Sequence, residues 1–193
     1  MKLLLSILSV AMLIPVTFQA NEDHQPYAGL ENRAISSLSS EDIADLEKGA
    51  GWGLALPAEL NGYPGPRHIL ELQEELDLTA DQVDKVEKLF AAMQQEAIEA
   101  GQTFIKAEED LDEIFRSSSA DRDKLAVAIS ASADARAKLR FIHLSQHLKT
   151  VAILTEDQIS KYNVFRGYAA NDPCANIPDG HDENMWKAHN NCG

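Results

Sequence analysis

The sequence predicts an all-α protein built on one long antiparallel helical hairpin with short flanking helices. Two observations predict this fold class: an L-T-x-D-Q phrase that occurs twice, at residues 78–82 and 154–158, and a long apolar repeat between the two copies. No segment alternates apolar and polar residues with the period of two that is typical of a half-buried strand. We expect the hairpin to form an intertwined dimer.

Each copy of the phrase has the features of a helix N-terminus. The threonine hydroxyl can accept a hydrogen bond from the third N–H of the helix, and the glutamine at that position can reach back to the threonine. The leading leucine can pack on the aliphatic residue that follows the phrase. The residues concerned are Leu78, Thr79 and Gln82 in the first copy and Leu154, Thr155 and Gln158 in the second. A looser third copy, at residues 38–43, predicts a further helix start.

Between residues 83 and 114, apolar or small residues recur at alternating steps of three and four. This spacing predicts one helix of about 55 Å packed along a partner, with Gly101 near its middle as a point that loosens or bends it. Residues 117–121 predict a turn, and a second long helix is expected at about 121–153.

Two short helices are expected next to the hairpin. One begins at Thr155 and ends near Gly167, a glycine suited to the position that follows a helix C-terminus. The other covers residues 66–76, with apolar residues on one face.

Residues 1–20 resemble a secretory signal peptide, with Lys2 ahead of an apolar run. The run, residues 3–16, is shorter than the roughly 20 residues of a membrane-spanning helix. We therefore expect export to the periplasm, with an uncleaved anchor as the alternative.

The rest of the chain divides into three parts. Residues 21–66 form an N-terminal extension with a short helix, residues 67–168 the hairpin domain, and residues 169–193 a tail. Cys174 and Cys192 lie in this tail and should pair in an oxidising compartment. The tail also holds a polar cluster, which is either a simple polar loop or a weak metal site: His181, Asp182, Glu183 and His189.

Composition excludes several functions. The chain has 17 basic and 31 acidic side chains, and a net charge of −14 argues against a nucleic-acid partner. No serine lies in the G-x-S-x-G motif of a nucleophile elbow. A phosphate-binding glycine loop follows a strand, and the glycines at residues 49–53 do not. We expect a protein that is not an enzyme.

The strongest candidate for chemistry is the histidine pair on the second long helix. His143 and His147 lie one turn apart, so both imidazoles can bind one ion. Imidazole ligands favour zinc first, then nickel, copper or cobalt, over calcium or magnesium. His68 can approach the pair, with Glu71 beside it as an oxygen donor. An ordinary solvated helix face is the alternative interpretation.

The signal peptide, the long hairpin and the paired L-T-x-x-Q phrases resemble the Spy/CpxP/ZraP superfamily of periplasmic stress and heavy-metal resistance proteins, over about residues 67–168. The resemblance implies a hairpin-based cradle that dimerises antiparallel. Some members are ATP-independent chaperones or inhibit envelope-stress sensor kinases, and others bind zinc, nickel, cobalt or copper. His143 and His147 occupy the place of a His-x-x-x-Met metal pair, and a histidine in place of the methionine implies a more zinc-like site.

The chain departs from this family in its N-terminal extension, its tail and its acidity, because the family's chaperone cradles are largely basic. Two functions remain. The first is a metal-responsive protein. The second is a chaperone or a partner of a membrane sensor, in which a dimer holds unfolded periplasmic polypeptide through exposed apolar side chains such as Met93, Phe104, Ile105 or Phe115.

Overall fold

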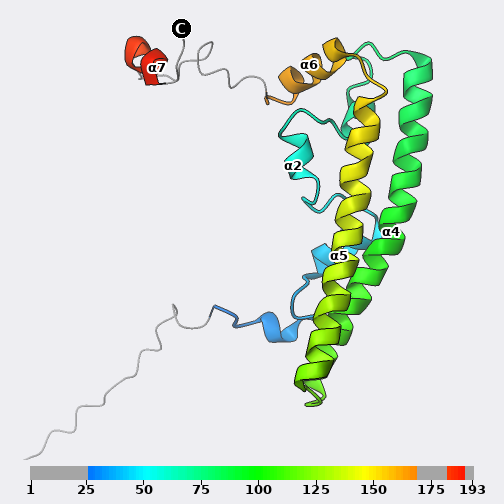
Figure 1. Ribbon diagram of the computed structural model, residues 1–193, viewed down its shortest axis with the longest axis vertical. Coiled ribbons are helices and arrows are strands. Elements are labelled where there is room, and N and C mark those ends of the chain that lie inside the picture. Colours follow the sequence, from blue (N-terminus) through cyan, green and yellow to red (C-terminus); the bar gives the residue numbers. More distant parts are fainter. Residues whose placement is uncertain (1–25, 169–181, 190–193) are drawn as a thin grey trace, which may run out of the picture. The chain divides into compact units, whose positions relative to one another are not determined.

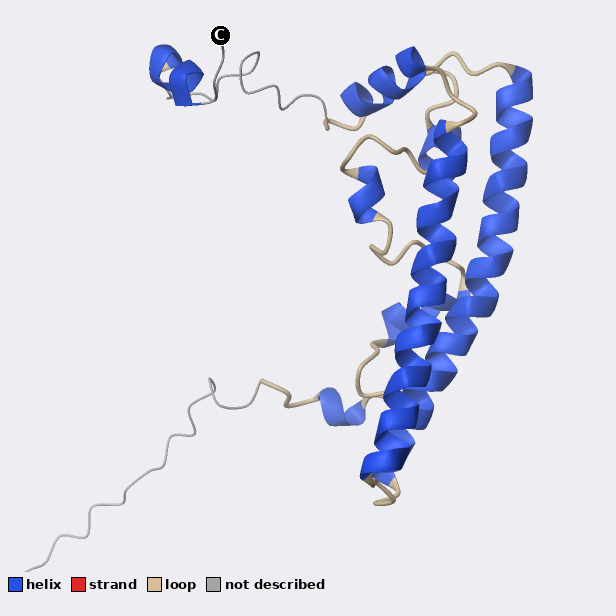
Figure 2. Cartoon of the chain, in the orientation of Figure 1, coloured by secondary structure: helices blue, strands red, loops and turns tan. Residues whose placement is uncertain are grey.

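The computed structural model describes residues 26–168 and 182–189, and these residues form helices without any β-strand (Figures 1 and 2). The all-α prediction is confirmed for this part of the chain. Two units are distinguished, divided after Asn32. The described residues of the first include a short 3-10 helix, η2 (Leu30–Asn32), where the Gly29 N–H donates to the Glu31 carboxylate over 2.6 Å.

The second unit is dominated by the predicted hairpin. Helices α4 (Ala80–Arg116) and α5 (Arg122–Val151) run antiparallel, in contact with each other (Figure 1). The turn between them contains Ser118 with a positive φ of 55°. Asp121 caps α5 by accepting a hydrogen bond from the Lys124 N–H over 2.9 Å. Both long helices lie within a few residues of the predicted bounds.

Helix α1 (Ser40–Glu47) begins at the third predicted capping box, with Ser39 as N-cap and Asp42 as its reciprocal partner. It packs across α4 at Gly101. A Cβ atom at Gly101 would lie only 2.5 Å from the Leu46 carbonyl oxygen, so the absence of a side chain permits this close approach. The glycine predicted to loosen the long helix is therefore the place where α1 contacts it.

The two copies of the L-T-x-D-Q phrase meet at the open end of the hairpin. In each copy the predicted capping box is formed. The two glutamines also bond to each other: Gln82 Nε2 donates to Gln158 Oε1 over 2.8 Å, and Gln158 Nε2 donates to Gln82 Oε1 over 3.1 Å. Each amide group reaches a carbonyl of the opposite turn as well, Ile153 for Gln82 and Leu76 for Gln158. An amide suits this role because it both donates and accepts.

Two short helices flank this end. Helix α6 (Glu156–Phe165) ends with Arg166 as C-cap, and Gly167, with a φ of 74°, follows it as predicted. The Tyr168 N–H bonds back to the Asn163 carbonyl over 2.8 Å. Helix α3 (Pro66–Glu71) is shorter than the predicted 66–76. The chain turns after Glu71 instead, through Asp77 with a φ of 51°.

Four buried side chains form the core at this end: Ile69, Leu76, Val86 and Tyr162. A second core lies between α1, α4 and α5 and includes Met93 and Phe104. These two residues are 7 % and 2 % exposed, so the expectation that they form an exposed apolar surface is wrong. Ile105 is half-buried, and only Phe115 of the four proposed residues is well exposed.

The tail contains a helix that the sequence reading did not anticipate, α7 (Glu183–His189). The signal peptide, the Cys174–Cys192 pair and His181 lie outside the described residues. In the described ranges, no helix combines the length and the apolar character needed to cross a membrane. The intertwined dimer stays a prediction.

Candidate functional site

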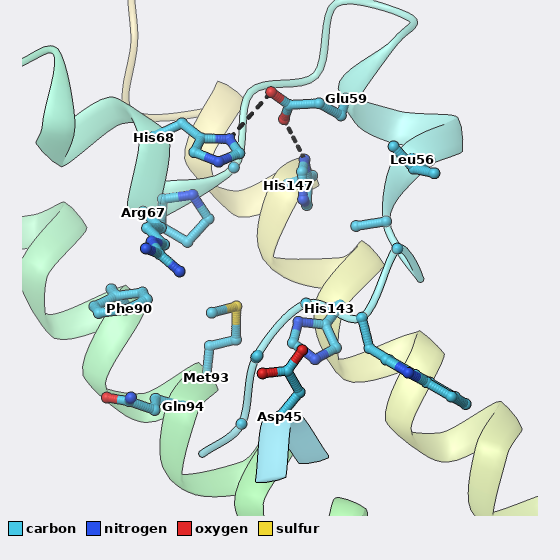
Figure 3. A pocket seen from close by; sticks show the side chains of 18 of the residues that line it. Asp45, Leu56, Glu59, Arg67, His68, Phe90, Met93, Gln94, His143 and His147 are labelled. Atoms are coloured by element: carbon cyan, nitrogen blue, oxygen red, sulfur yellow. Dashed lines mark hydrogen bonds and ion pairs between the residues drawn. The ribbon is translucent and has the colours of Figure 1, made fainter. Parts of the chain in front are cut away.

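The three histidines singled out from the sequence line one pocket of about 590 Å³ (Figure 3). His143 and His147 come from α5, and His68 comes from α3. The N-terminal extension forms another wall and contributes Glu59, the last residue of the short helix α2 (Leu56–Glu59). The structure thus brings the predicted His68 to the same cavity as the predicted pair.

The histidine pair is buried. His143 is 3 % exposed and His147 7 %, and Gln146 between them is 1 % exposed, so the interpretation of this stretch as a solvated helix face is wrong. The Nε2 atom of His143 is buried and has no hydrogen-bond partner among the described residues. Burial, and next the proximity of His147, lower the pKa of His143 below its ordinary 6.5. This ring is therefore neutral at pH 7, as a metal ligand must be.

The orientation of His147 is fixed by the N-terminal extension. Its Nδ1 atom lies 2.6 Å from the Tyr63 carbonyl oxygen. Because a carbonyl can only accept, Nδ1 carries a proton, and the tautomer that fits this bond has its lone pair on Nε2. Gly65 lies against the same ring, where a Cβ atom would be 2.8 Å from Cε1 and 3.0 Å from Nε2.

Glu59 was missed by the sequence reading, and it is the most connected polar group of the site. Its Oε1 atom accepts hydrogen bonds from the Tyr162 hydroxyl, from the Tyr168 hydroxyl over 3.2 Å and from His68 Nδ1 over 3.1 Å. Its Oε2 atom lies 3.8 Å from His147 Nδ1 and has no hydrogen-bond partner in the part of the chain that the structure describes. Figure 3 shows the carboxylate between the two imidazoles.

These contacts keep the carboxylate ionised although it is only 5 % exposed. Burial by itself would raise the pKa of Glu59, but the hydrogen bonds from His68 and Tyr162 outweigh burial and lower the pKa to about 2. Burial and the bond to this carboxylate raise the pKa of the Tyr162 hydroxyl far above its ordinary value of 10. Glu59 therefore places a fixed negative charge beside His68 and His147.

One sequence signal could have revealed Glu59. It is the single charged residue within an apolar stretch at residues 54–60, and Pro57 marks a helix start just before it. A lone carboxylate among apolar residues is buried only when it has partners.

The predicted oxygen donor, Glu71, does not line the pocket. Its carboxylate instead accepts a hydrogen bond from Arg67 Nε over 2.9 Å, in an exposed i,i+4 pair. The Glu71 side chain is exposed, and the carboxylate beside His68 is supplied by Glu59.

The remaining walls combine the apolar side chains of Trp52, Phe90 and Met93 with the charged side chains of Asp45, Lys48 and Arg67. The Trp52 indole donates to Asp42 over 2.8 Å and its ring contacts Phe104 at 5.7 Å between centroids. Among the described residues, no group of three or more His, Cys, Asp or Glu side chains is placed to hold a metal ion. The site therefore offers two imidazole donors on one helix, with a cavity beside them.

Comparison of the chain with protein-family models, with curated proteins and with solved structures gave no significant match. The properties of this site accordingly rest on its own geometry.

Proposed function

We propose that the protein is a non-enzymatic, exported protein that binds a divalent transition metal, zinc first, through His143 and His147. The observation that carries the proposal is the state of these two rings. His143 presents a buried Nε2 atom without a partner, and His147 is held in the tautomer that leaves its Nε2 lone pair free.

The donors fit such an ion. Two imidazoles one turn apart suit zinc, nickel, copper or cobalt, and a catalytic or sensing site commonly leaves further positions to water. The pocket of about 590 Å³ has room for such ligands. The neutral His143 imidazole and the ionised Glu59 nearby also favour a cation over an anion.

The fold is compatible with the resemblance to the Spy/CpxP/ZraP proteins. The resemblance depends on the signal peptide, on the hairpin of two long helices and on an L-T-x-x-Q phrase at two helix starts, and the last two features are present in the described residues. In this proposal the protein acts in the periplasm as part of an envelope-stress or heavy-metal response.

The test is calorimetric titration of zinc, nickel and copper into the chain without residues 1–20. We expect binding at micromolar concentrations or tighter, and its loss in a His143→Ala/His147→Ala variant. Lys138→Ala, which changes an exposed residue of the same helix, is the matched control and should bind normally. Metal binding that survives in the double variant would place the ligands elsewhere, and no binding by the unmodified chain would refute the proposal.

A second function is favoured by one surface. Val127, Phe141 and Leu148 are 71 %, 71 % and 62 % exposed and lie at multiples of seven residues along α5, with the exposed Asp134 at the position between the first two. The exposed cations Arg140 and Lys149 lie beside them. Such an apolar strip is suited to hold unfolded polypeptide, a membrane sensor or a second copy of the chain. Suppression of aggregation of a denatured client, and sedimentation of the metal-free chain, test these roles.

A further inference from the structure

Residues 49–65, which we call the strap, connect α1 to α3 and carry α2 across the pocket (Figures 1 and 3). The strap is held at two places. At the first, a Cβ atom on Gly49 would lie 2.8 Å from the Gln94 carbonyl of α4, and Trp52 bonds to Asp42 of α1. This anchor involves none of the pocket's histidines.

The second anchor consists of contacts to the histidines and tyrosines of the site. The Tyr63 carbonyl accepts from His147, Gly65 lies against the same ring, and Glu59 accepts from His68 and two tyrosine hydroxyls. Between the two anchors, Leu56 and Leu60 are 54 % and 58 % exposed. Contacts with His68 and His147 are therefore part of what holds the strap from α2 onward, together with the two tyrosine hydroxyls and the buried Pro64.

The hydrogen bond from His147 to the Tyr63 carbonyl should become stronger when a metal ion binds His147. An ion on Nε2 draws electron density from the ring and makes the Nδ1–H a stronger donor, which is why ligating histidines usually donate this proton to a carbonyl or a carboxylate. The Tyr63 carbonyl and the free Glu59 Oε2 atom, 3.8 Å away, are the two acceptors on that side of the ring.

We propose that the Tyr63 carbonyl and Glu59 are positioning groups for His147, and that docking of the strap and occupancy of the metal site are linked. Metal on His147 tightens the strap, and a loosened strap weakens metal binding by the same factor, because coupling between two binding equilibria is reciprocal. The inference rests on the proposed metal function. It adds a consequence of metal binding: occupancy of the buried site makes the strap, residues 49–65, more ordered.

The first test is hydrogen exchange on the chain without residues 1–20, with and without saturating zinc. The amides of Leu60 and Tyr63 report on the strap, since they bond to the Leu56 and Ala58 carbonyls within it. We expect zinc to slow their exchange about tenfold or more, an effect of the size typical of coupled sites. Amides of the α4–α5 turn, at residues 117–121, should not change.

A pair of glycine variants tests the reverse direction. Gly65→Ala forces the strap and the His147 ring apart, because the new Cβ atom would lie 2.8 Å from Cε1. Since the same atom would lie 3.0 Å from the Nε2 donor, faster exchange of the strap amides in the metal-free variant is the readout that reports on the strap itself. Gly51→Ala is the matched control within the strap, since no atom lies within 4 Å of its added Cβ. We expect zinc affinity to fall about tenfold or more in Gly65→Ala, with faster exchange of the strap in the metal-free protein, and to stay unchanged in Gly51→Ala.

The outcomes separate this inference from the proposed function. If the unmodified chain binds zinc at His143 and His147 while strap exchange stays the same, the linkage is refuted and the metal function stands. If the unmodified chain binds no metal, both are refuted. Circular dichroism of Gly65→Ala establishes that it folds, and the exchange experiment on the unmodified chain decides the question without it.

Discussion

The carboxylate of Glu59 provides the sharpest test of how the open end of the hairpin is held. We expect Glu59→Gln to destabilise the metal-free protein by roughly 3 kcal/mol at pH 7. The magnitude follows from the lowered pKa: the difference between the ordinary 4.5 and about 2 measures how much better the folded protein binds the ionised form than the neutral form. Glutamine keeps the shape of the side chain but removes the charge that His68 and both tyrosines bond to.

The same reasoning fixes the dependence on pH. A carboxylate whose pKa is lower in the folded state stabilises the protein fully above its unfolded pKa, and this contribution is lost as the pH falls toward the folded pKa. The difference in unfolding free energy between the unmodified protein and Glu59→Gln should therefore be constant above about pH 5 and shrink between about pH 4.5 and 2.

The assay is urea denaturation followed by circular dichroism from pH 7 down to pH 3. Glu71→Gln is the matched control, because Glu71 forms only an exposed pair with Arg67 and such pairs contribute about 0–1 kcal/mol. Equal destabilisation by the two variants at pH 7, or a difference that does not shrink in acid, would refute the reasoning.

Three further changes test other parts of the structure. Gln82→Glu removes the amide donor that bonds to Gln158 and should cost about 1–3 kcal/mol in urea denaturation, although glutamate preserves the capping box. Gly101→Ala, which would normally stabilise a helix interior, should lower the melting temperature, because its Cβ atom would lie 2.5 Å from the Leu46 carbonyl. Phe141→Ser should leave stability within about 0.5 kcal/mol, as expected for an exposed residue, and any chaperone activity that depends on the α5 strip should fall in an aggregation assay.

Sequence patterns predicted those parts of the fold that depend on residues close together in the sequence. The capping boxes at Thr79 and Thr155 located the starts of α4 and α6, and the alternating three- and four-residue steps located the length of α4, because capping and helical periodicity depend on near neighbours in the sequence. The meeting of Gln82 with Gln158 could not be read from either phrase alone, since it depends on the hairpin bringing the two turns together.

The candidate site was only half predictable for the same reason. The spacing of His143 and His147 predicts a shared helix face, and whether that face is buried depends on the N-terminal extension that covers it. The carboxylate near His68 was assigned to Glu71, a neighbour in sequence. The structure supplies Glu59 instead, from a separate short helix.

The unsatisfied nitrogen of His143 offers a way to tell a structural histidine from a functional one. A buried polar atom without a partner costs about 1–3 kcal/mol, so an apolar side chain of similar size at this position should not destabilise the protein. We therefore expect His143→Leu to unfold at equal or higher urea concentration than the unmodified metal-free chain and to lose zinc binding. If the His143 ring instead stabilised the core, His143→Leu would unfold at a lower urea concentration than the unmodified chain, and any metal binding would be unchanged. Greater stability combined with lost binding is the pattern expected where a buried polar group is retained for its ligand.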